Sequence, residues 1–354
     1  MSLLKADRWW SWKIPPMLAM AYFGLLSAPA PPPIERTVTQ IALFLVAVIG
    51  IAGFGHLFTD MFDVDEDRQR RQSNTWGDAG TARRTLLLAG VLLASSLPWA
   101  WIPIGRLGAL LLAAEFMMFA LYAVPPIRLK SRGLPGIVAD GMYAHALPAL
   151  WSWLPFAHLS GAETLLWIGV VIGIWGLSVG VRELMHHQAI DAEPDRAAGA
   201  MTYGARRGRQ HLMRVLQRFV LPIELASLIL LLGAIGTKTL LPAAGFALYF
   251  GWSIIKVRAT WLERIALFPV ARNEDGVTIL ARGILSPFYY GWLPLLLAAA
   301  LALRDNTYLI LLGLHFVLFR AMITRLVERE AYSTAIAVRA LLRNRVRSPS
   351  IRRS

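Results

Sequence analysis

Two clusters of acidic residues, each at the end of a long apolar run, carry side chains that could hold a metal ion. The first cluster holds Asp60, Asp63 and Asp67, and the second holds Asp191 and Asp195. The last two acids of the first cluster recur in the second at a constant offset of 128 positions, which suggests a pseudo-repeat of helical units. On a helix, acids three and four positions apart share a face and repel one another unless a cation lies between them. Carboxylate oxygens are the ligands that Mg²⁺ prefers, so the pattern predicts a metal and phosphate site rather than two solvated helix ends.

A row of polar residues leads into the second cluster. Glu183, His187, Asp191 and Asp195 follow one another at four-residue steps, which places them in one stripe on a helix. A histidine in such a stripe is suited to metal binding or to proton transfer near neutral pH. It could equally form a hydrogen bond with the neighbouring carboxylate and shape the pocket. Both roles for His187 stay open at this point.

The elements that must position these acids are membrane helices. The chain has 354 residues, of which 56% are hydrophobic, and its apolar runs are long enough to cross a hydrocarbon core of about 30 Å. These runs lie at roughly 14–29, 38–59, 85–103, 107–124, 136–156, 163–185, 215–236, 239–255, 288–303 and 307–324. The sequence therefore predicts an all-α, polytopic bundle of nine or ten transmembrane helices. The absence of cysteine excludes disulfides, thiolate catalysis and cysteine-ligated metals.

The distribution of charge predicts the orientation in the membrane. The net charge is +14, but Lys and Arg lie between the apolar runs, where they meet lipid headgroups, so we expect no nucleic-acid partner. With the N-terminus inside, the outer loops contain only Arg36, Arg106, Lys238 and Arg304. Both termini and both acidic clusters are then cytoplasmic. We expect one transmembrane domain over 1–330 and a basic cytoplasmic tail over 331–354.

The acidic clusters resemble the paired motifs of the UbiA superfamily of intramembrane prenyltransferases. That family has Asn-Asp-x-x-Asp-x-x-x-Asp after its second helix and Asp-x-x-x-Asp after its sixth. The chain shows Thr59-Asp60-x-x-Asp63-x-x-x-Asp67 and Asp191-x-x-x-Asp195 at these places. Two further segments, 122–130 (YAVPPIRLK) and 196–202 (RAAGAMT), are similar to family elements after the fourth helix and after the second acidic motif. The resemblance covers roughly residues 15–325, and Thr59 departs from it where the family usually has Asn.

The resemblance implies a Mg²⁺-dependent transferase that moves a polyprenyl group from a polyprenyl diphosphate to a lipophilic or small-molecule acceptor. The metal ligands would be Asp60, Asp63, Asp67, Asp191 and Asp195. The catalytic residues would be Asp63, Asp67, Asp191, Asp195 and His187. Substrate contacts would come from Arg70, Arg71, Tyr122, Arg128, Lys130, Arg182 and Gln188. Arg182 and Gln188 lie in the part of the motif that departs from the quinone-type members, where we expect the choice of substrate to reside.

Two features of the spans bear on the same chemistry. An allylic cation needs a dry wall, and aromatic faces stabilise positive charge, so Phe54, Phe58, Tyr122 and Tyr143 are candidates for that wall. Glycines of the sixth span, Gly173, Gly176 and Gly180, are predicted to permit close helix packing.

Three other functions keep the same acidic pairs or the same membrane class. One branch of the superfamily transfers phosphoribosyl from its diphosphate to polyprenyl phosphate, and another cyclises prenyl diphosphates. An ion-coupled transporter would also contain intramembrane acids and repeats. The acids of this chain lie at helix ends on one side, whereas a carrier is expected to place them near the membrane midplane, so transport is the weaker alternative.

Overall fold

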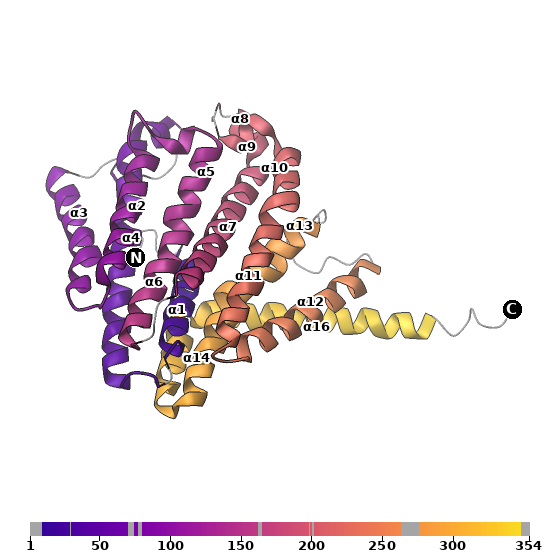
Figure 1. The fold of residues 1–354 in the computed structure, drawn as a ribbon. Helices are drawn as coiled ribbons and strands as arrows, with labels where there is room; N and C mark the ends of the chain where they lie inside the picture. Colours follow the sequence, from indigo (N-terminus) through magenta and orange to yellow (C-terminus); the bar gives the residue numbers. More distant parts are fainter. Residues whose placement is uncertain are drawn as a thin grey trace.

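Helices running up and down one bundle make up the architecture (Figure 1). The computed structural model describes residues 9–28, 30–69, 74–76, 80–161, 165–197, 199, 202–262 and 276–347, with positions 66, 67, 69, 260–262 and 344–347 described by their backbone alone. Within these ranges every regular element is helical, which confirms the all-α prediction. Where the structure describes them, the ten predicted apolar runs are mainly helical.

The N-terminal half of the bundle contains six α-helices and three short 3-10 or π segments. They are α1 (Trp10–Leu26), α2 (Ile34–Gln69), α3 (Thr81–Ser96), η3 (Leu97–Ala100), α4 (Gly105–Ala123), η4 (Leu129–Ser131), α5 (Leu134–Gly141), η5 (Met142–Ala146) and α6 (Leu147–Leu159). Helix α1 lies at the centre of the bundle, where Leu18 to Phe23 are almost completely buried (Figure 1).

The C-terminal half continues the bundle and ends in a long helix that leaves it sideways (Figure 1). Its elements are α7 (Leu166–Ile190), α8 (Ala192–Ala197), α9 (Tyr203–Arg207), α10 (Arg209–Val215), η6 (Leu216–Val220), α11 (Leu221–Gly236), α12 (Leu241–Leu262), α13 (Gly276–Thr278), η7 (Ile279–Leu285), η8 (Phe288–Trp292), α14 (Leu293–Arg304), η9 (Asn306–Tyr308), α15 (Leu309–Leu318) and α16 (Arg320–Arg347). Lys256 of α12 forms an ion pair with Glu330 of α16 and a hydrogen bond of 3.1 Å with Ser333. Helix α16 continues through position 331, where we predicted that the tail begins.

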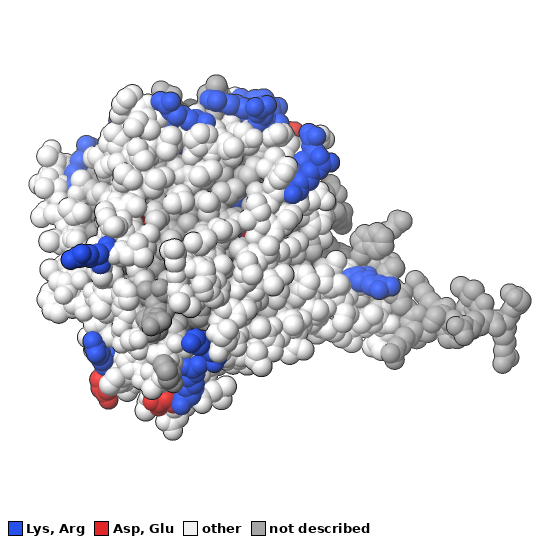
Figure 2. Space-filling model, viewed as in Figure 1, with Lys and Arg blue, Asp and Glu red and all other residues white. Residues whose placement is uncertain are grey.

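The described helices support an integral membrane protein. Five helical segments are long and apolar enough to cross a membrane: Ile34–Asp65, Gly105–Ala123, Leu166–Ile190, Arg209–Gly236 and Gly276–Arg304. The pair Asn306–Leu318 and Arg320–Arg343, bent by 81°, would make a sixth if it forms one span. The predicted total of nine or ten spans therefore stays a prediction. Figure 2 shows a largely uncharged side surface, with most of the visible Lys and Arg near its upper and lower edges.

Four π-helical segments interrupt the long helices, and each ends two residues before a proline. The segments η5, η6, η7 and η8 precede Pro148, Pro222, Pro287 and Pro294. Proline has no N–H to donate, and its ring clashes with the carbonyl four residues earlier in an α-helix. A wider turn accommodates both defects and lets the helix continue. The prolines thus change which side chains η5, η7 and η8 present at the centre of the bundle.

Glycines of α7 allow the chain around η5 to approach closely. A methyl group on Gly176 would lie 2.9 Å from Ala146 Cα, and one on Gly180 would lie 2.6 Å from Gly141 Cα. Real side-chain atoms do not approach that closely, so these positions need glycine. The packing role predicted for Gly176 and Gly180 is confirmed. The result is that polar residues of α5 and η5 come to lie beside those of α7.

Candidate active site

The first acidic motif occupies the last turns of α2, against a segment that folds back on the helix. Thr75 Oγ1 donates to Asp60 Oδ2 at 3.0 Å, and Asn74 Nδ2 donates to the Asp60 carbonyl at 2.9 Å. Trp76 is buried, and its Nε1 donates to the Leu57 carbonyl at 2.6 Å. Asp60 is itself buried in this arrangement. The 74–76 segment therefore fixes the position of the first acid of the motif.

The loop after α4 reaches the second acid of this motif. Arg128 Nη2 donates to Asp63 Oδ1 at 3.0 Å, and Lys130 Nζ contacts the same oxygen. Arg128 has φ of 37°, a left-handed conformation that non-glycine residues rarely adopt. The strained backbone turns the chain back towards α2. The structure thus brings together three predicted site residues, Asp63, Arg128 and Lys130.

The second acidic motif begins where α7 ends. Its first acid, Asp191, accepts a contact of 2.9 Å from His187 Nδ1, and both side chains are well exposed. Asp195 lies on the short helix α8, and its Oδ2 accepts a hydrogen bond of 3.0 Å from Thr202 Oγ1. Contacts between exposed charges contribute little to stability, so this motif is held mainly by its loop.

The loop that follows α8 is tied to both sides of the motif. Thr202 caps α9 by accepting from Ala205 N at 3.1 Å while it donates to Asp195. Gln188 Oε1 accepts from Gly204 N at 3.0 Å, and Gly204 packs so closely on Gln188 that a methyl group would lie 2.3 Å from the Gln188 carbonyl oxygen. Figure 1 shows α8 and α9 at the same end of the bundle as the C-terminal part of α2.

The chemistry of these acids fits a hard divalent cation, because every described member supplies carboxylate oxygen. Asp60, Asp63, Asp191 and Asp195 each already accept a contact from a neighbouring side chain. Among the residues that the structure describes, no three His, Asp or Glu lie close enough together to hold a metal ion. The Asp67 side chain lies outside the described atoms, as do Arg70 and Arg71. The predicted metal and substrate contacts of these residues therefore stay predictions.

Tyr122, another predicted substrate contact, belongs to an aromatic cluster beside the bundle centre. Its ring lies 5.1 Å from that of Tyr143, and the Tyr143 hydroxyl donates to Asp140 Oδ1 at 2.6 Å. Tyr143 also packs on Phe119, with ring centroids 4.9 Å apart. Tyr122 and Tyr143, two of the four residues predicted to form an aromatic wall, are thus linked to the carboxylate of Asp140 in α5. That such a wall stabilises a cation stays a prediction.

A cavity of about 1240 Å³ lies between α1, the α5–α6 region, α7, the η7–η8 region and α16. Its buried lining is mostly apolar or aromatic and includes Met17, Pro148, Ala149, Trp175, Val179 and Tyr289. Half-buried polar residues also line the cavity: Lys13, Asp140, His145, Glu183, Thr278, Ser286 and Arg329. Exposed lining residues mark the openings: Trp12, His187, Ile190, Arg209, Arg282, Arg325, Glu328 and Tyr332. His187 therefore belongs both to the cavity and, through Asp191, to the second acidic motif.

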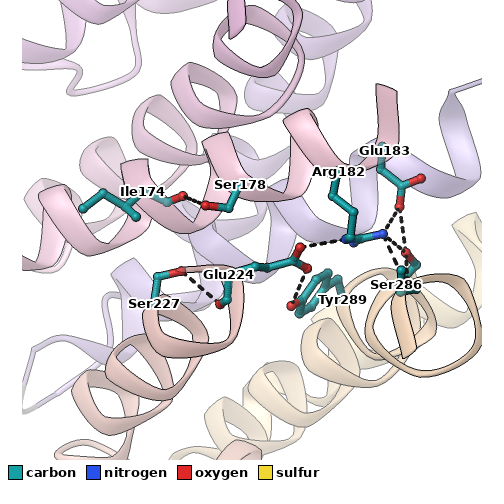
Figure 3. Close-up of polar contacts among 9 residues, drawn as sticks. Ile174, Ser178, Arg182, Glu183, Glu224, Ser227, Ser286 and Tyr289 are labelled. Carbon is teal, nitrogen blue, oxygen red and sulfur yellow. Dashed lines mark hydrogen bonds and ion pairs between the residues drawn. The ribbon is translucent and has the colours of Figure 1, made fainter. Parts of the chain in front are cut away.

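A buried network of charges supports one of these wall residues (Figure 3). Arg182 is completely buried, and its Nε donates to Glu224 Oε2 at 2.7 Å. Its Nη1 donates to Glu183 Oε1 at 2.8 Å and to Ser286 Oγ at 3.1 Å. The Tyr289 hydroxyl donates to Glu224 Oε1 at 3.0 Å. Arg182, a predicted substrate contact, does not line the cavity, whereas its partner Glu183 does.

Several of these residues were absent from the predicted site. Asp140 and Glu224 are single acids inside apolar spans, a feature that marks functional positions in membrane proteins and that was available as a signal. Glu183 was seen only as part of the polar stripe. Ser286 and Tyr289 carry no such signal, because only the packing of α7 against η7 and η8 gives them their partners.

Comparison with known proteins places the chain in a family. A sequence model described as the UbiA prenyltransferase family matches residues 15–273, which is most of the chain. The chain belongs to the UbiA prenyltransferase family. Membership confirms the resemblance of the motifs and the prediction of a prenyltransferase enzyme.

Two curated relatives of the chain are named lycopene elongase/hydratase. The protein from Haloferax volcanii is 30% identical over 46% of this chain and 51% of its own length, so the chain spans about half of that relative. The protein from Halobacterium salinarum is 30% identical over 56% of this chain and 68% of its own length. A solved structure of a UbiA homologue from Archaeoglobus fulgidus, bound to GPP and Mg²⁺, is 15% identical with a TM-score of 0.49, covering 95% of this chain and 98% of that one.

Proposed function

We propose that the protein is a Mg²⁺-dependent intramembrane transferase that moves a prenyl group from an allylic prenyl diphosphate to a lipophilic acceptor. The observation that carries the proposal is the position of His187, which contacts Asp191 of the second acidic motif and also lines the cavity. A polar site for a diphosphate therefore adjoins an apolar chamber for an isoprenoid chain. Family membership and the two curated relatives support the same reaction class.

The acidic residues and their basic neighbours have distinct tasks in this proposal. Asp60, Asp63, Asp67, Asp191 and Asp195 would hold Mg²⁺, which when bound neutralises the negative charge of the diphosphate. The basic residues contribute forked or point-charge contacts to phosphate oxygens. They are Arg70, Arg71, Arg128 and Lys130, of which the last two already lie on Asp63.

The cavity would hold the isoprenoid chain and keep water from the reacting carbon. Its buried part is lined by Trp175, Tyr289 and aliphatic residues, which exclude water and face positive charge with aromatic rings. The curated relatives are named for lycopene, so a long isoprenoid hydrocarbon is the first acceptor to test.

We extend the proposal to the topology: one transmembrane unit over 1–330, a basic tail over 331–354, and cytoplasmic motifs and termini.

The test of the reaction is product analysis with purified protein in lipid nanodiscs. We expect Mg²⁺, dimethylallyl or geranylgeranyl diphosphate and lycopene to give a prenylated product by mass spectrometry, with release of diphosphate. Asp63→Asn and Asp191→Asn should abolish turnover and leave the protein folded, whereas the exposed Asp305→Asn should retain it. A ribosylated lipid, formed from phosphoribosyl diphosphate and polyprenyl phosphate, would refute prenyl transfer, and so would a cyclic product formed without acceptor.

The predicted orientation has a separate test. The chain contains no cysteine, so single cysteines can be introduced and labelled without background. In intact cells a membrane-impermeant maleimide should label Lys238→Cys and should reach Arg206→Cys only after lysis. The reverse pattern would contradict a cytoplasmic active site.

A further inference from the structure

Glu183 lines the cavity, and only one of its two carboxylate oxygens takes part in the network drawn in Figure 3. Oε1 accepts from Arg182 Nη1 at 2.8 Å and from Ser286 Oγ at 2.7 Å. Oε2 accepts no hydrogen bond from the residues that the structure describes. The side chain of Glu183 is one-third exposed, while that of Arg182 is completely buried. Hydrogen bonds to Oε1 thus fix the orientation of the Glu183 carboxylate, and Oε2 is available to a ligand in the cavity.

The charge around Arg182 is unusual because two carboxylates share one guanidinium. Glu224 contacts Nε and Glu183 contacts Nη1, so the buried group of three residues carries a net negative charge. Among the described residues, Arg182 is the only cation within ion-pairing distance of Glu183. The basic lining residues Arg209, Arg282 and Arg325 are exposed at the openings of the cavity. The part of the wall around Glu183 therefore has an excess of negative charge, while the half-buried cations Lys13 and Arg329 line other parts of the cavity and the openings have an excess of positive charge.

This polarity suits a substrate that is anionic at one end and becomes cationic further in. Cleavage of an allylic C–O bond leaves the electron pair on the diphosphate and a positive charge on the carbon chain. Addition of that cation to a double bond of the acceptor moves the positive charge onto the acceptor, which becomes a neutral alkene by losing a proton to the released diphosphate. A carboxylate oxygen and aromatic rings stabilise such a charge in a site without water. Trp175 and Tyr289, which lie edge to face at 5.2 Å, line the same wall.

We propose that Glu183 is a catalytic residue that stabilises the carbocation of prenyl transfer through its free Oε2. Arg182, Ser286 and Glu224 are positioning residues that hold the carboxylate at the cavity wall. The proposal rests on the proposed prenyl transfer for its role in the reaction. The site itself, an anionic pocket for a lipophilic cation, can be tested without turnover.

The direct test uses an isoprenoid that carries a mimic of the cation. N,N-dimethylgeranylamine is an ammonium ion at neutral pH, and its uncharged analogue has carbon in place of nitrogen. Binding is followed by quenching of tryptophan fluorescence in detergent at fixed micelle concentration, since Trp12 and Trp175 line the cavity. We expect the wild-type protein to prefer the ammonium compound about tenfold or more, as for a charge-assisted contact.

The variants distinguish Glu183 from the other acids of the cavity. Glu183→Gln keeps the shape and should reduce the preference to about one, and Ser286→Ala should reduce it in part. Glu35→Gln, at an exposed position outside the cavity, should retain the full preference. The proposal is overturned if Glu183→Gln retains the preference, if wild type shows none, or if Asp140→Asn removes it while Glu183→Gln does not.

A kinetic experiment tests whether Glu183 acts in the prenyl-transfer reaction. With Mg²⁺, dimethylallyl diphosphate and lycopene, Glu183→Gln should lower kcat at least about tenfold with little change in KM for the donor. Equal loss in kcat for the control variant Glu35→Gln, or a loss confined to KM for Glu183→Gln, would contradict the catalytic role. If wild type binds the ammonium compound but transfers no prenyl group, the proposed function fails and the cation site stands.

Discussion

Replacing Glu224 with glutamine tests whether the network behind Glu183 carries a true buried charge pair. Glu224 and Arg182 are both completely buried, with Oε2 and Nε 2.7 Å apart. Removing one partner of a buried pair typically costs about 3–5 kcal/mol, because the other charge is left without compensation. Arg182 keeps its contact with Glu183 in the variant, so we expect a loss of about 3 kcal/mol, at the lower end of that range.

The assay is equilibrium unfolding in mixed micelles, followed by circular dichroism as the fraction of denaturing detergent rises. Tyr289→Phe removes only the 3.0 Å hydrogen bond from the tyrosine hydroxyl to Glu224 and should cost about 1 kcal/mol. The double variant Glu224→Gln/Arg182→Met removes both charges of the pair. It should lose less stability than the sum of the losses measured for Glu224→Gln and Arg182→Met singly. A change of less than about 0.5 kcal/mol for Glu224→Gln would refute the buried pair.

Three further predictions follow from the packing, the cap and the metal chemistry. Gly180→Ala should destabilise the bundle by about 1–3 kcal/mol because its methyl group meets Gly141, whereas Gly90→Ala in open space should be neutral or slightly stabilising in the same unfolding assay. Thr202→Ala removes the cap of α9 and the contact to Asp195, so amide hydrogen exchange over 203–207 should become faster. Thr202→Ser keeps the hydroxyl and should exchange at a rate close to wild type. Equal exchange rates in the two variants would contradict the cap. Chelation with EDTA should stop diphosphate release and added Mg²⁺ should restore it, and release that continued after chelation would exclude the metal-dependent reaction.

The sequence predicted those parts of the molecule that depend on local pattern. Apolar runs identified the helices because burial in lipid requires side chains of one kind over a continuous length. The spacing of Asp63, Arg128 and Lys130 within recognisable motifs identified residues that the structure does bring into contact. Their distances in sequence gave no indication of which acid the basic residues would reach. That contact depends on the left-handed turn at Arg128.

The network around Arg182 could not be predicted because its members come from three separate helices. Arg182 and Glu183 are neighbours on α7, Glu224 lies on α11, and Ser286 and Tyr289 lie beside a proline in the last part of the bundle. Its place before the second motif, where the chain departs from the quinone-type members, made Arg182 a predicted substrate contact. Its complete burial behind Glu183 follows from how these helices pack, which pattern and spacing do not contain.

The prolines explain how the sequence determines part of the cavity lining. Each described π segment ends two residues before a proline, and three of these four segments contribute to the cavity: η5 with His145, η7 with Arg282, and η8 with Tyr289. A regular α-helix through these positions would present different side chains, because one extra residue per turn rotates everything that follows. The prolines were visible in the sequence as interruptions of apolar runs. Each proline follows a wider turn and does not break the helix. As a result, η5, η7 and η8 place polar and aromatic side chains in the lining of the cavity that Glu183 also lines.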